Sequence, residues 1–431
     1  MPQLAPVPPA EPLPAVPSAA DLLVVGAGAA GLFAATWAGR TAAAAGRTPS
    51  IVAVDGARKL GAKILVAGGG RCNVTHVEVR ETDYAGSSPP AIRKVLRRFD
   101  AADTVQFFAA AGVALKQEET GKLFPVTDSA RTVLDALVRE ARAAGAALVH
   151  PARVERLVRT ADGFVAETPA GAIRCRAVIL CTGGRSLPKS GSDGGGFLLA
   201  ESLGHSLTSP IVPALVPLVL PAGHWITALA GLTLPTEVAL SSATGRRLFA
   251  TTGSTLCTHV GLSGPAILDA SRHWLMARAD DPGVRLALNW LPGSSADAVD
   301  RLLVEGQRRG ALATLRERLP DRLARALCGL AEVPATGDVS RDARRRLAAL
   351  VAATPLPVTG DRGFAVAEAT AGGVPLAEVR LETMESRLCP GLFLAGEILD
   401  VDGRIGGFNF QWAWASGFVA GTAAAVRLTT A

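Results

Sequence analysis

Glycines and acidic side chains follow short apolar runs of this chain at spacings that suit a phosphate-bearing ligand. Two such runs flank an Ala-rich, Pro-free stretch (32–45) that predicts a helix; glycines follow the first run, and the second ends in an acid. In a strand–turn–helix–strand unit, glycines allow a tight turn and close backbone approach, the helix N-terminus binds the pyrophosphate, and the acid accepts from a ribose hydroxyl. The pattern therefore predicts a dinucleotide site made by Gly26, Gly28, Ala30, Gly31 and Asp55.

Three later glycine clusters favour FAD over NAD as the bound dinucleotide. One lies in 58–75, which we expect to be a flavin-facing loop, one follows the apolar run 177–181, and one lies near the C-terminus. A strand that ends in Thr-Gly and a late strand that ends in Gly-Glu are typical of an FAD-type Rossmann domain. We expect the late acid to accept from the ribityl chain, and a helix near Gly407 to point its N-terminus at the flavin. The further cofactor residues predicted are Lys63, Gly69, Gly70, Arg71, Cys72, Asn73, Thr182, Gly183, Gly184, Gly396, Glu397, Gly407 and Asn409.

Three side chains, two in the loop 58–75 and one before the Ser-Gly-Pro turn of the β-rich part, each have two interpretations. Arg71 can offer its charge to a phosphate or to the flavin C2 carbonyl. Cys72 is either a buried thiol that only packs or a proton donor beside the flavin. His259 is either a hydrogen-bonded structural residue or a substrate-facing acid or base, because imidazole titrates near neutrality. Cys72 and His259 are the candidate catalytic residues.

The motifs resemble those of the BaiN/YhiN-like (RdsA) flavoproteins, a family that includes a bile-acid reductase and a large-subunit rRNA dihydrouridine synthase. The similarity extends from residue 21 to the C-terminus. It rests on GAGAAG, GGGRCN and GGFNFQ and on the segments 258–266, 371–374, 383–386 and 396–403. The resemblance implies an FAD-dependent reductase that passes hydride from NAD(P)H to a C=C bond, with uridine in 23S rRNA as the favoured substrate.

Composition and the placing of Pro and Gly along the chain predict an α/β fold. It consists of an FAD-binding, glutathione-reductase-like Rossmann domain interrupted by a β-rich domain that carries a helical insertion. Helices are expected at 91–112 and 129–145, and the short apolar runs broken by Pro and Gly in 205–292 indicate strands. The expected parts are a disordered Pro/Ala-rich tail (1–20), the FAD domain (21–193 and 353–431), the β-rich substrate domain (194–295) and the helical insertion (296–352).

The helical insertion is rich in arginine. Residues 296–350 hold eleven Arg and eight Asp or Glu, a difference of +3, against a formal net charge of +6 for the whole chain. Such a run is either a solvated helix surface or an RNA-contacting module, since the forked guanidinium suits phosphate. Aromatic residues are absent from this insertion, which argues against stacking on single-stranded bases.

The remaining composition narrows the class of protein. A hydrophobic content of 49% and a charged content of 19% indicate a globular chain. The six cysteines lack CxxC spacing, so the sequence predicts neither a metal site nor a disulfide framework. It holds no apolar stretch near the ~18 residues of a membrane helix. We therefore expect a cytoplasmic flavoenzyme without a metal or membrane partner. Two alternatives stay open: a small-molecule flavoenzyme (an enone reductase or amine oxidase), and a non-catalytic RNA-binding protein that keeps FAD as a structural prop.

Overall fold

A computed structural model of the chain describes residues 13–334 and 339–430. Residues 1–12 of the expected tail lie outside the described residues. The first strand, β1 (Ala19–Val25), begins two residues before the predicted start of the FAD domain.

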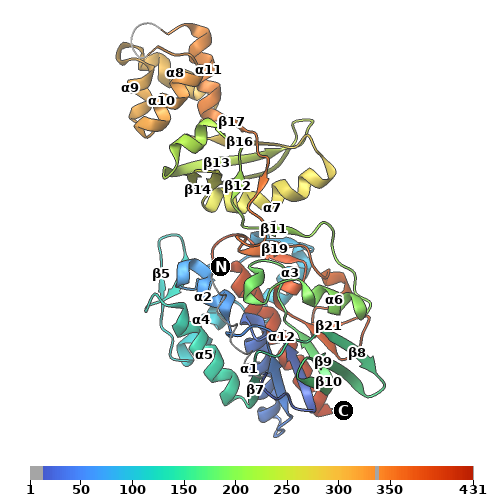
Figure 1. The fold of residues 1–431 in the computed structure, drawn as a ribbon. Helices are drawn as coiled ribbons and strands as arrows, with labels where there is room; N and C mark the ends of the chain where they lie inside the picture. The colour runs from blue at the N-terminus through green and yellow to red at the C-terminus, as the bar shows by residue number, and fades with distance from the viewer. Residues whose placement is uncertain (1–12, 335–338, 431) are drawn as a thin grey trace, which may run out of the picture. The chain divides into compact units, whose positions relative to one another are not determined.

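The chain divides into two compact units (Figure 1). Unit 1 comprises Met1–Ser209 and Gly372–Ala431, and unit 2 comprises Pro210–Ala371. These boundaries lie later than the predicted ones at 193/194 and 352/353. Helix α6 (Gly195–Ser202) packs against a strand of unit 1, so it belongs there. Three strands after residue 353 pair with strands of unit 2: β17 (Thr354–Leu356), β18 (Gly360–Asp361) and β19 (Ala369–Ala371).

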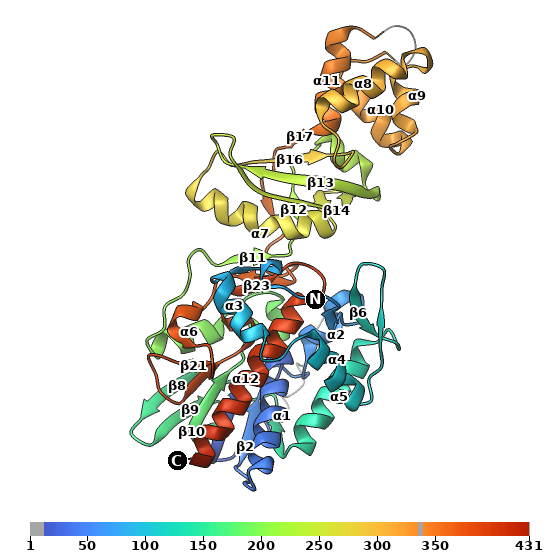
Figure 2. The ribbon, with the colours of Figure 1, turned by 180° about the vertical axis from the view of Figure 1, so that it is seen from behind.

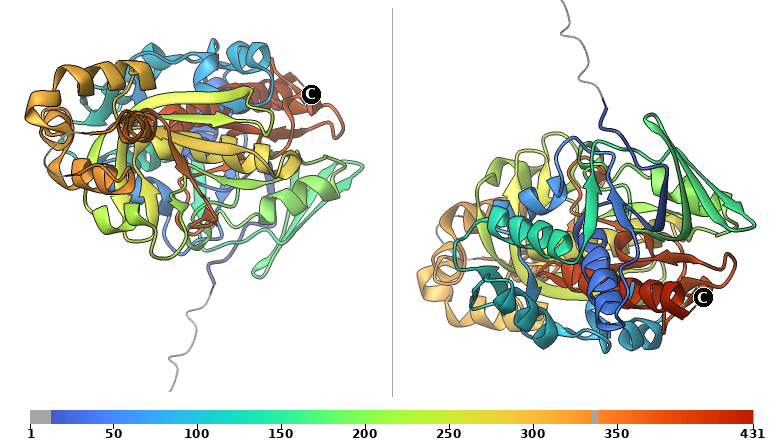
Figure 3. Two further views of the ribbon diagram at one scale, coloured as in Figure 1. Left: turned by 90° about the horizontal axis from the view of Figure 1, so that it is seen from above. Right: turned by 90° about the horizontal axis from the view of Figure 1, so that it is seen from below.

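The main sheet of unit 1 is the predicted Rossmann sheet. Its strand order is β20-β21-β22-β10-β1-β2-β7, and the five strands from β22 to β7 are parallel. The antiparallel strands β8 and β9 extend it beside β10, away from α1 and α5 (Figure 3). The strands are β2 (Ile51–Val54), β7 (Ala146–Val149), β8 (Arg156–Thr160), β9 (Gly163–Thr168), β10 (Gly171–Leu180), β20 (Val379–Arg380), β21 (Glu385–Ser386) and β22 (Leu392–Leu394).

Helices α1 (Ala29–Ala44) and α12 (Phe408–Thr430) lie side by side in unit 1 (Figure 2). Their small residues allow a very close approach: a Cβ added at Gly421 would lie 2.2 Å from the Ala34 carbonyl oxygen. Helix α5 (Ala130–Ala143) packs on α1 as well. Close packing of α1 and α12 fixes the two helix N-termini that the sequence assigns to the cofactor.

Two predicted segments differ from expectation. The segment 91–112 forms two helices, α3 (Pro89–Leu96) and α4 (Ala101–Ala110), because Asp100 caps α4 by accepting from the backbone N–H groups of Ala102 and Asp103. Much of the expected flavin-facing loop 58–75 is helix α2 (Ala62–Gly70), although its last turn is distorted at 67–69.

Short strands complete unit 1. One small sheet has the order β3-β6-β5, and another pairs β23 with β4. The strands are β3 (Thr75–His76), β4 (Tyr84–Gly86), β5 (Leu115–Gln117), β6 (Lys122–Pro125) and β23 (Val401–Gly403).

Unit 2 combines β-rich and helical parts, as predicted. Its larger sheet has the order β17-β16-β13-β14-β15-β12-β18, helix α7 (Pro265–Asp280) packs on β13 and β14, and β11 pairs with β19. Helices α8 to α11 follow β16 in the chain and return to β17 (Figure 1). The elements are β11 (Val212–Ala214), β12 (Leu218–Val219), β13 (Thr233–Ser241), β14 (Arg247–Thr258), β15 (Gly261–Ser263), β16 (Arg285–Asn289), α8 (Ala296–Glu305), α9 (Ala311–Arg316), α10 (Asp321–Leu330) and α11 (Arg341–Ala352).

Candidate active site

The turn between β1 and α1 has the geometry of a pyrophosphate site. Gly26 has φ +96°, and a Cβ there would lie 2.4 Å from the Cys181 carbonyl oxygen. A Cβ at Gly31 would lie 1.8 Å from the Gly26 carbonyl oxygen, so both positions require glycine. By contrast, no described atom lies within 4 Å of a Cβ built at Gly28, the N-cap of α1. The turn therefore leaves open space at the helix N-terminus, where an anion binds.

Asp55 lies at the end of β2 and is held by the same turn. Its carboxylate accepts from the backbone N–H groups of Ala27 and Ala57, both at 2.8 Å. Burial raises the pKa of Asp55, and these two hydrogen bonds act in the opposite direction. A carboxylate offers about four acceptor sites, so two remain for a ribose diol.

The glycines of the second cluster form the distorted end of α2. Gly68, Gly69 and Gly70 all have positive φ, between 57° and 84°. No described atom lies within 4 Å of a Cβ built at Gly69. Backbone rather than side chain therefore faces this space, which suits the approach of a flat ring.

The structure gives Arg71 partners other than those expected. Its guanidinium lies 2.7 Å from a Glu118 carboxylate oxygen and over the Phe124 ring, 4.1 Å from the ring centroid. Its role as a phosphate or flavin ligand stays a prediction.

Cys72 and Asn73 are both buried. The Cys72 side chain is fully enclosed, and burial raises the pKa of its thiol far above the ordinary value, so the thiol is protonated. The Asn73 Oδ1 atom is buried and accepts no hydrogen bond from the described residues. A Cβ at Gly407 would lie 2.9 Å from this oxygen, so the glycine keeps the space beside it open.

Beyond β10, two hydroxyl groups are buried without a hydrogen-bond partner among the described residues: Thr182 Oγ1 and Ser192 Oγ. A Cβ at Gly183 would lie 2.7 Å from Ser192 Oγ, and one at Gly191 would lie 3.7 Å from an Asp55 carboxylate oxygen. Thus the Thr-Gly-Gly segment and the loop after it lie next to the acid of β2. Ser192 was not predicted, although the glycine-rich stretch 191–196 around it was a usable signal.

A polar network joins α2 to the ends of β10 and β22. The Lys63 ammonium donates to Ser186 and to Glu397, and the Ser186 hydroxyl donates to Glu397 at 2.8 Å. Glu397 follows Gly396, whose missing Cβ would lie 2.8 Å from the Cβ of Ala30. The network orients the acid predicted to accept from the ribityl chain. Ser186 was missed because a single serine carries no spacing signal.

Asn409 positions the loop before α12 instead of projecting freely. Its amide accepts from the Gly403 N–H and donates to the Gly403 carbonyl, both at 2.9 Å. Gly407 has φ +92°, and its missing Cβ would lie 2.7 Å from the Thr75 backbone. These contacts fix the start of α12 where the sequence placed it.

His259 lies in unit 2, in the two-residue turn between β14 and β15. Its side chain is exposed and has no hydrogen-bond or ion-pair partner among the described residues. Cys72 belongs to unit 1, so the joint action of these two residues stays a prediction.

FAD fits the residues of unit 1. The glycine turn is open at Gly28, Asp55 keeps acceptor capacity, and the orphaned polar atoms of Asn73, Thr182 and Ser192 call for hydrogen-bond partners that a ligand can supply. Gly26, Asp55, Cys181 and Ala395 all directly follow parallel strands, so these groups share one edge of the sheet.

The arginines of α8 to α11 fall into two groups. Arg309, Arg316, Arg325, Arg344 and Arg346 are ion-paired, and Arg322 donates to the Ala228 carbonyl oxygen. The second group forms no side-chain hydrogen bond or ion pair with the described residues and consists of Arg301, Arg308, Arg318, Arg341 and Arg345. Arg341 and Arg345 still lie close enough to Asp300 to help lower its pKa.

Within the described ranges, no helix is long and apolar enough to cross a membrane. No cluster of three or more His, Cys, Asp or Glu side chains in the same residues is arranged to hold a metal ion.

Comparison with known proteins places this site in a family. A model of the "HI0933-like protein Rossmann domain" matches residues 20–423. The 3-dehydro-bile acid delta(4,6)-reductase of Clostridium scindens is 35% identical over 412 residues, which cover 94% of this chain and 98% of the relative. The ribosomal RNA dihydrouridine synthase of Escherichia coli is 33% identical over 406 residues, which cover 92% and 96%. The open conformation of a flavocytochrome c3 fumarate reductase shares the fold, with TM-score 0.50 and 17% identity, covering 95% of this chain and 79% of that one.

Proposed function

Since the chain belongs to the HI0933-like family of Rossmann-domain proteins, we propose that this FAD-dependent oxidoreductase reduces the C5=C6 bond of a uridine in ribosomal RNA. The names of two relatives describe reactions at C=C bonds: dihydrouridine formation and the reduction of a bile-acid derivative at delta(4,6). Reduction of a C=C bond is therefore the common chemistry, and the proposal concerns which substrate carries it.

The observation that carries the RNA assignment is the set of unpaired arginines on unit 2. Arg301, Arg308, Arg318, Arg341 and Arg345 are exposed and form no hydrogen bond or ion pair with an acid among the described residues. Arg341 and Arg345 help to lower the pKa of Asp300, but their donors are open to phosphate. A steroid-like enone has no need of such a surface. An enzyme that modifies ribosomal RNA acts in the cytoplasm. The six cysteines, all buried and none in a disulfide, fit that reducing compartment.

Saturation of the C5=C6 bond adds one hydride and one proton. FAD, when bound, supplies hydride chemistry, and we propose NAD(P)H as the source of the hydride. The N-terminus of α1, open at Gly28, would hold the pyrophosphate, and Asp55 would hold the adenosine ribose. Lys63 and Ser186 orient Glu397 toward its role at the ribityl chain.

The proton requires a positioned acid, which typically contributes ~10²–10⁴-fold to the rate. We propose Cys72 for this role because its buried thiol keeps its proton at neutral pH. His259, exposed at the β14–β15 turn, is the second candidate, either as the acid or to stabilise charge on the base.

Nucleoside mass spectrometry of ribosomal RNA tests the proposal. In a strain that lacks this gene, dihydrouridine at one rRNA position should disappear, and the wild-type gene should restore it. A Gly28→Val gene should fail to restore it. Unchanged dihydrouridine in the deletion strain would reject the RNA assignment and favour the second candidate, reduction of a steroid-like enone. That candidate is supported by the 35% identical bile-acid reductase, and NAD(P)H-dependent reduction of such an enone by the purified protein would test it.

A further inference from the structure

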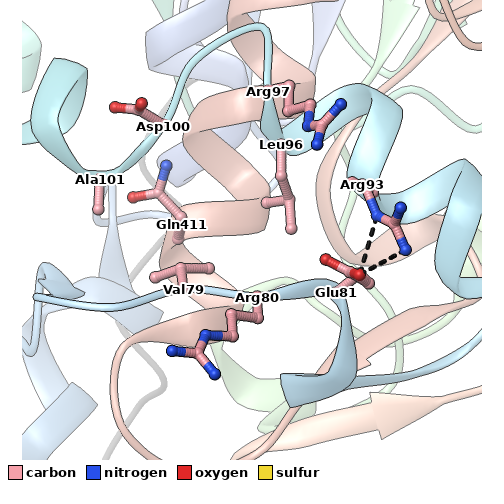
Figure 4. Close-up of a pocket in the computed structure, with 9 residues that line it drawn as sticks. All are labelled: Val79, Arg80, Glu81, Arg93, Leu96, Arg97, Asp100, Ala101 and Gln411. Carbon is pink, nitrogen blue, oxygen red and sulfur yellow. Dashed lines mark hydrogen bonds and ion pairs between the residues drawn. The ribbon is translucent and has the colours of Figure 1, made fainter.

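Unit 1 contains a cationic pocket that the FAD site does not use (Figure 4). Its volume is about 480 Å³, within the ordinary range for ligand sites. Arg80 reaches it from the segment before β4, and Arg93 and Arg97 reach it from α3 and the residue that follows it. Glu81, Asp100 and Gln411 are also among its lining residues.

The three lining arginines and the two lining acids leave a formal charge of +1. Glu81 forms an ion pair with Arg93, with 2.6 Å between Oε1 and Nη2. The pKa of Glu81 is lowered, first by a backbone hydrogen bond of its own and then by Arg93 and Arg97, so this carboxylate is ionised near both. Asp100 is engaged by the N–H groups at the start of α4.

Arg97 and Arg80 are the lining arginines whose positive charge is least offset by an acidic partner. Arg97 is exposed and has no hydrogen-bond or ion-pair partner for its side chain in the described part of the chain. Arg80 pairs with Glu78 at 2.9 Å, but both side chains are about 70% exposed, and such surface pairs are worth little. Arg97, the C-cap of α3, stands four residues after Arg93, and Glu81 partly offsets the repulsion between these two like charges.

Gln411, one of the lining residues, already has hydrogen-bond partners. Gln411 is fully buried: its oxygen accepts from Thr75 and Thr104, and its nitrogen donates to the Phe99 carbonyl. The donors left for a ligand are therefore those of the lining arginines and not that of Gln411.

We propose that this pocket binds a phosphate group through Arg80, Arg93 and Arg97, at a site distinct from the FAD pyrophosphate. The guanidinium groups match phosphate in charge and in forked donor geometry. Two ligands of this enzyme class carry such a group: the backbone of an RNA strand and the NAD(P)H reductant. Only the first source rests on the proposed function; the phosphate chemistry rests on the pocket itself.

The test uses the full-length, FAD-loaded protein and two matched double variants. Arg80→Glu/Arg97→Glu changes two pocket residues. Arg98→Glu/Arg142→Glu makes the same charge change at two exposed arginines that do not line the pocket. Neither side chain forms a hydrogen bond or ion pair with the described residues. Arg142 also lies in the last turn of a helix, so it controls for the favourable interaction of a cation with a helix C-terminus.

Two probes distinguish the phosphate sources: an rRNA fragment, by fluorescence anisotropy at several salt concentrations, and NADPH, by the concentration dependence of flavin bleaching without oxygen. The pocket variant should bind one probe at least ~10-fold more weakly than the control. If RNA is the source, its log–log salt slope should fall by about 1.4 for two lost contacts. Loss of RNA binding alone assigns the RNA backbone, and loss of NADPH affinity alone assigns the reductant.

The proposal is overturned if both double variants bind each probe equally well, or lose affinity equally. Flavin content and thermal unfolding are measured in parallel, and Arg80→Gln/Arg97→Gln replaces the Glu variant if the latter loses flavin. A wild-type protein that neither binds nor modifies rRNA refutes the proposed function. The NADPH measurement then still tests whether the pocket binds a phosphate group.

Discussion

At the scale of single residues, two glycines of one turn should respond to substitution in opposite ways. A Cβ at Gly28 meets open space, whereas a Cβ at Gly31 would lie 1.8 Å from a carbonyl oxygen. Gly28→Val should therefore leave the apoprotein as stable as the wild type but abolish FAD binding, because valine occupies the place of the pyrophosphate. Gly31→Ala should lower the unfolding temperature of the apoprotein itself.

Flavin absorbance and thermal unfolding of the apoproteins measure these two effects. Full flavin content in Gly28→Val would show that the dinucleotide does not bind at this turn.

The second prediction at this scale concerns Cys72. Cys72→Ala should keep FAD and NAD(P)H oxidation but slow product formation by ~10²-fold or more, as expected on removal of a general acid. Because burial raises the pKa of this thiol above its usual ~8.5, wild-type activity should not fall between pH 7 and 9 through thiol ionisation. Cys175→Ala, a buried cysteine on β10, is the matched control. A fully active Cys72→Ala protein would leave the thiol only a packing role.

The sequence pattern is most informative where backbone geometry restricts the amino acid, although the cofactor roles of these residues stay predictions. Gly26, Gly31 and Gly407 occupy positions where a side chain would collide with backbone, and such restrictions leave a spacing pattern. Ser186 and Ser192 left none, because a hydroxyl is recruited by three-dimensional proximity and its neighbours in sequence say nothing about its partner.

At the scale of elements, α8 and α11 separate structural arginines from available ones. Arg344 on α11 donates to Asp300 on α8 at 2.7 and 3.3 Å. Arg341 and Arg345 make no hydrogen bond or ion pair with the described residues and act on Asp300 only through their charge. Arg341→Glu/Arg345→Glu should weaken rRNA binding and its salt dependence with little effect on stability. Arg344→Glu should destabilise unit 2, because Asp300 would face a second carboxylate.

Acid titration provides the measurement for this pair. Arg344 lowers the pKa of Asp300, so the pair contributes stability above the unfolded value near 3.9 and loses it as pH falls through the lowered pKa. Arg344→Gln should therefore reduce the stability difference between pH 7 and pH 3. RNA affinity that is unaffected by Arg341→Glu/Arg345→Glu would point to another surface.

Element boundaries were harder to predict than element types. The apolar positions of 91–112 fit one helix, but the chain leaves the helix after Leu96, and the Asp100–Asp103 capping box starts a new one. The capping box is visible in the sequence, but the apolar residues at helical spacing across it favoured the prediction of one continuous helix. Residues 353–371 join unit 2 through strands of two or three residues, too short for any periodicity to reveal.

At the scale of the whole molecule, the two units divide the predicted tasks. Every predicted cofactor residue lies in unit 1, while His259 and the unpaired arginines of the helical insertion lie in unit 2. The chain leaves and re-enters unit 1 at neighbouring points, since the Thr208 N–H donates to the Gly373 carbonyl at 2.9 Å. A short Gly-Ser linker can therefore replace residues 210–371 without straining unit 1.

This shortened chain should fold and bind FAD, because the strands of the parallel sheet and the helices α1 and α12 are all retained. It should lose affinity for rRNA and form no dihydrouridine, since the unpaired arginines are absent. Flavin absorbance, thermal unfolding and nucleoside mass spectrometry measure the three properties. The Gly28→Val form of the same shortened chain is the control for specific flavin binding. A shortened protein that folds but binds no flavin would show that unit 2 completes the cofactor site, whereas one that still modifies rRNA would place the substrate site wholly within unit 1.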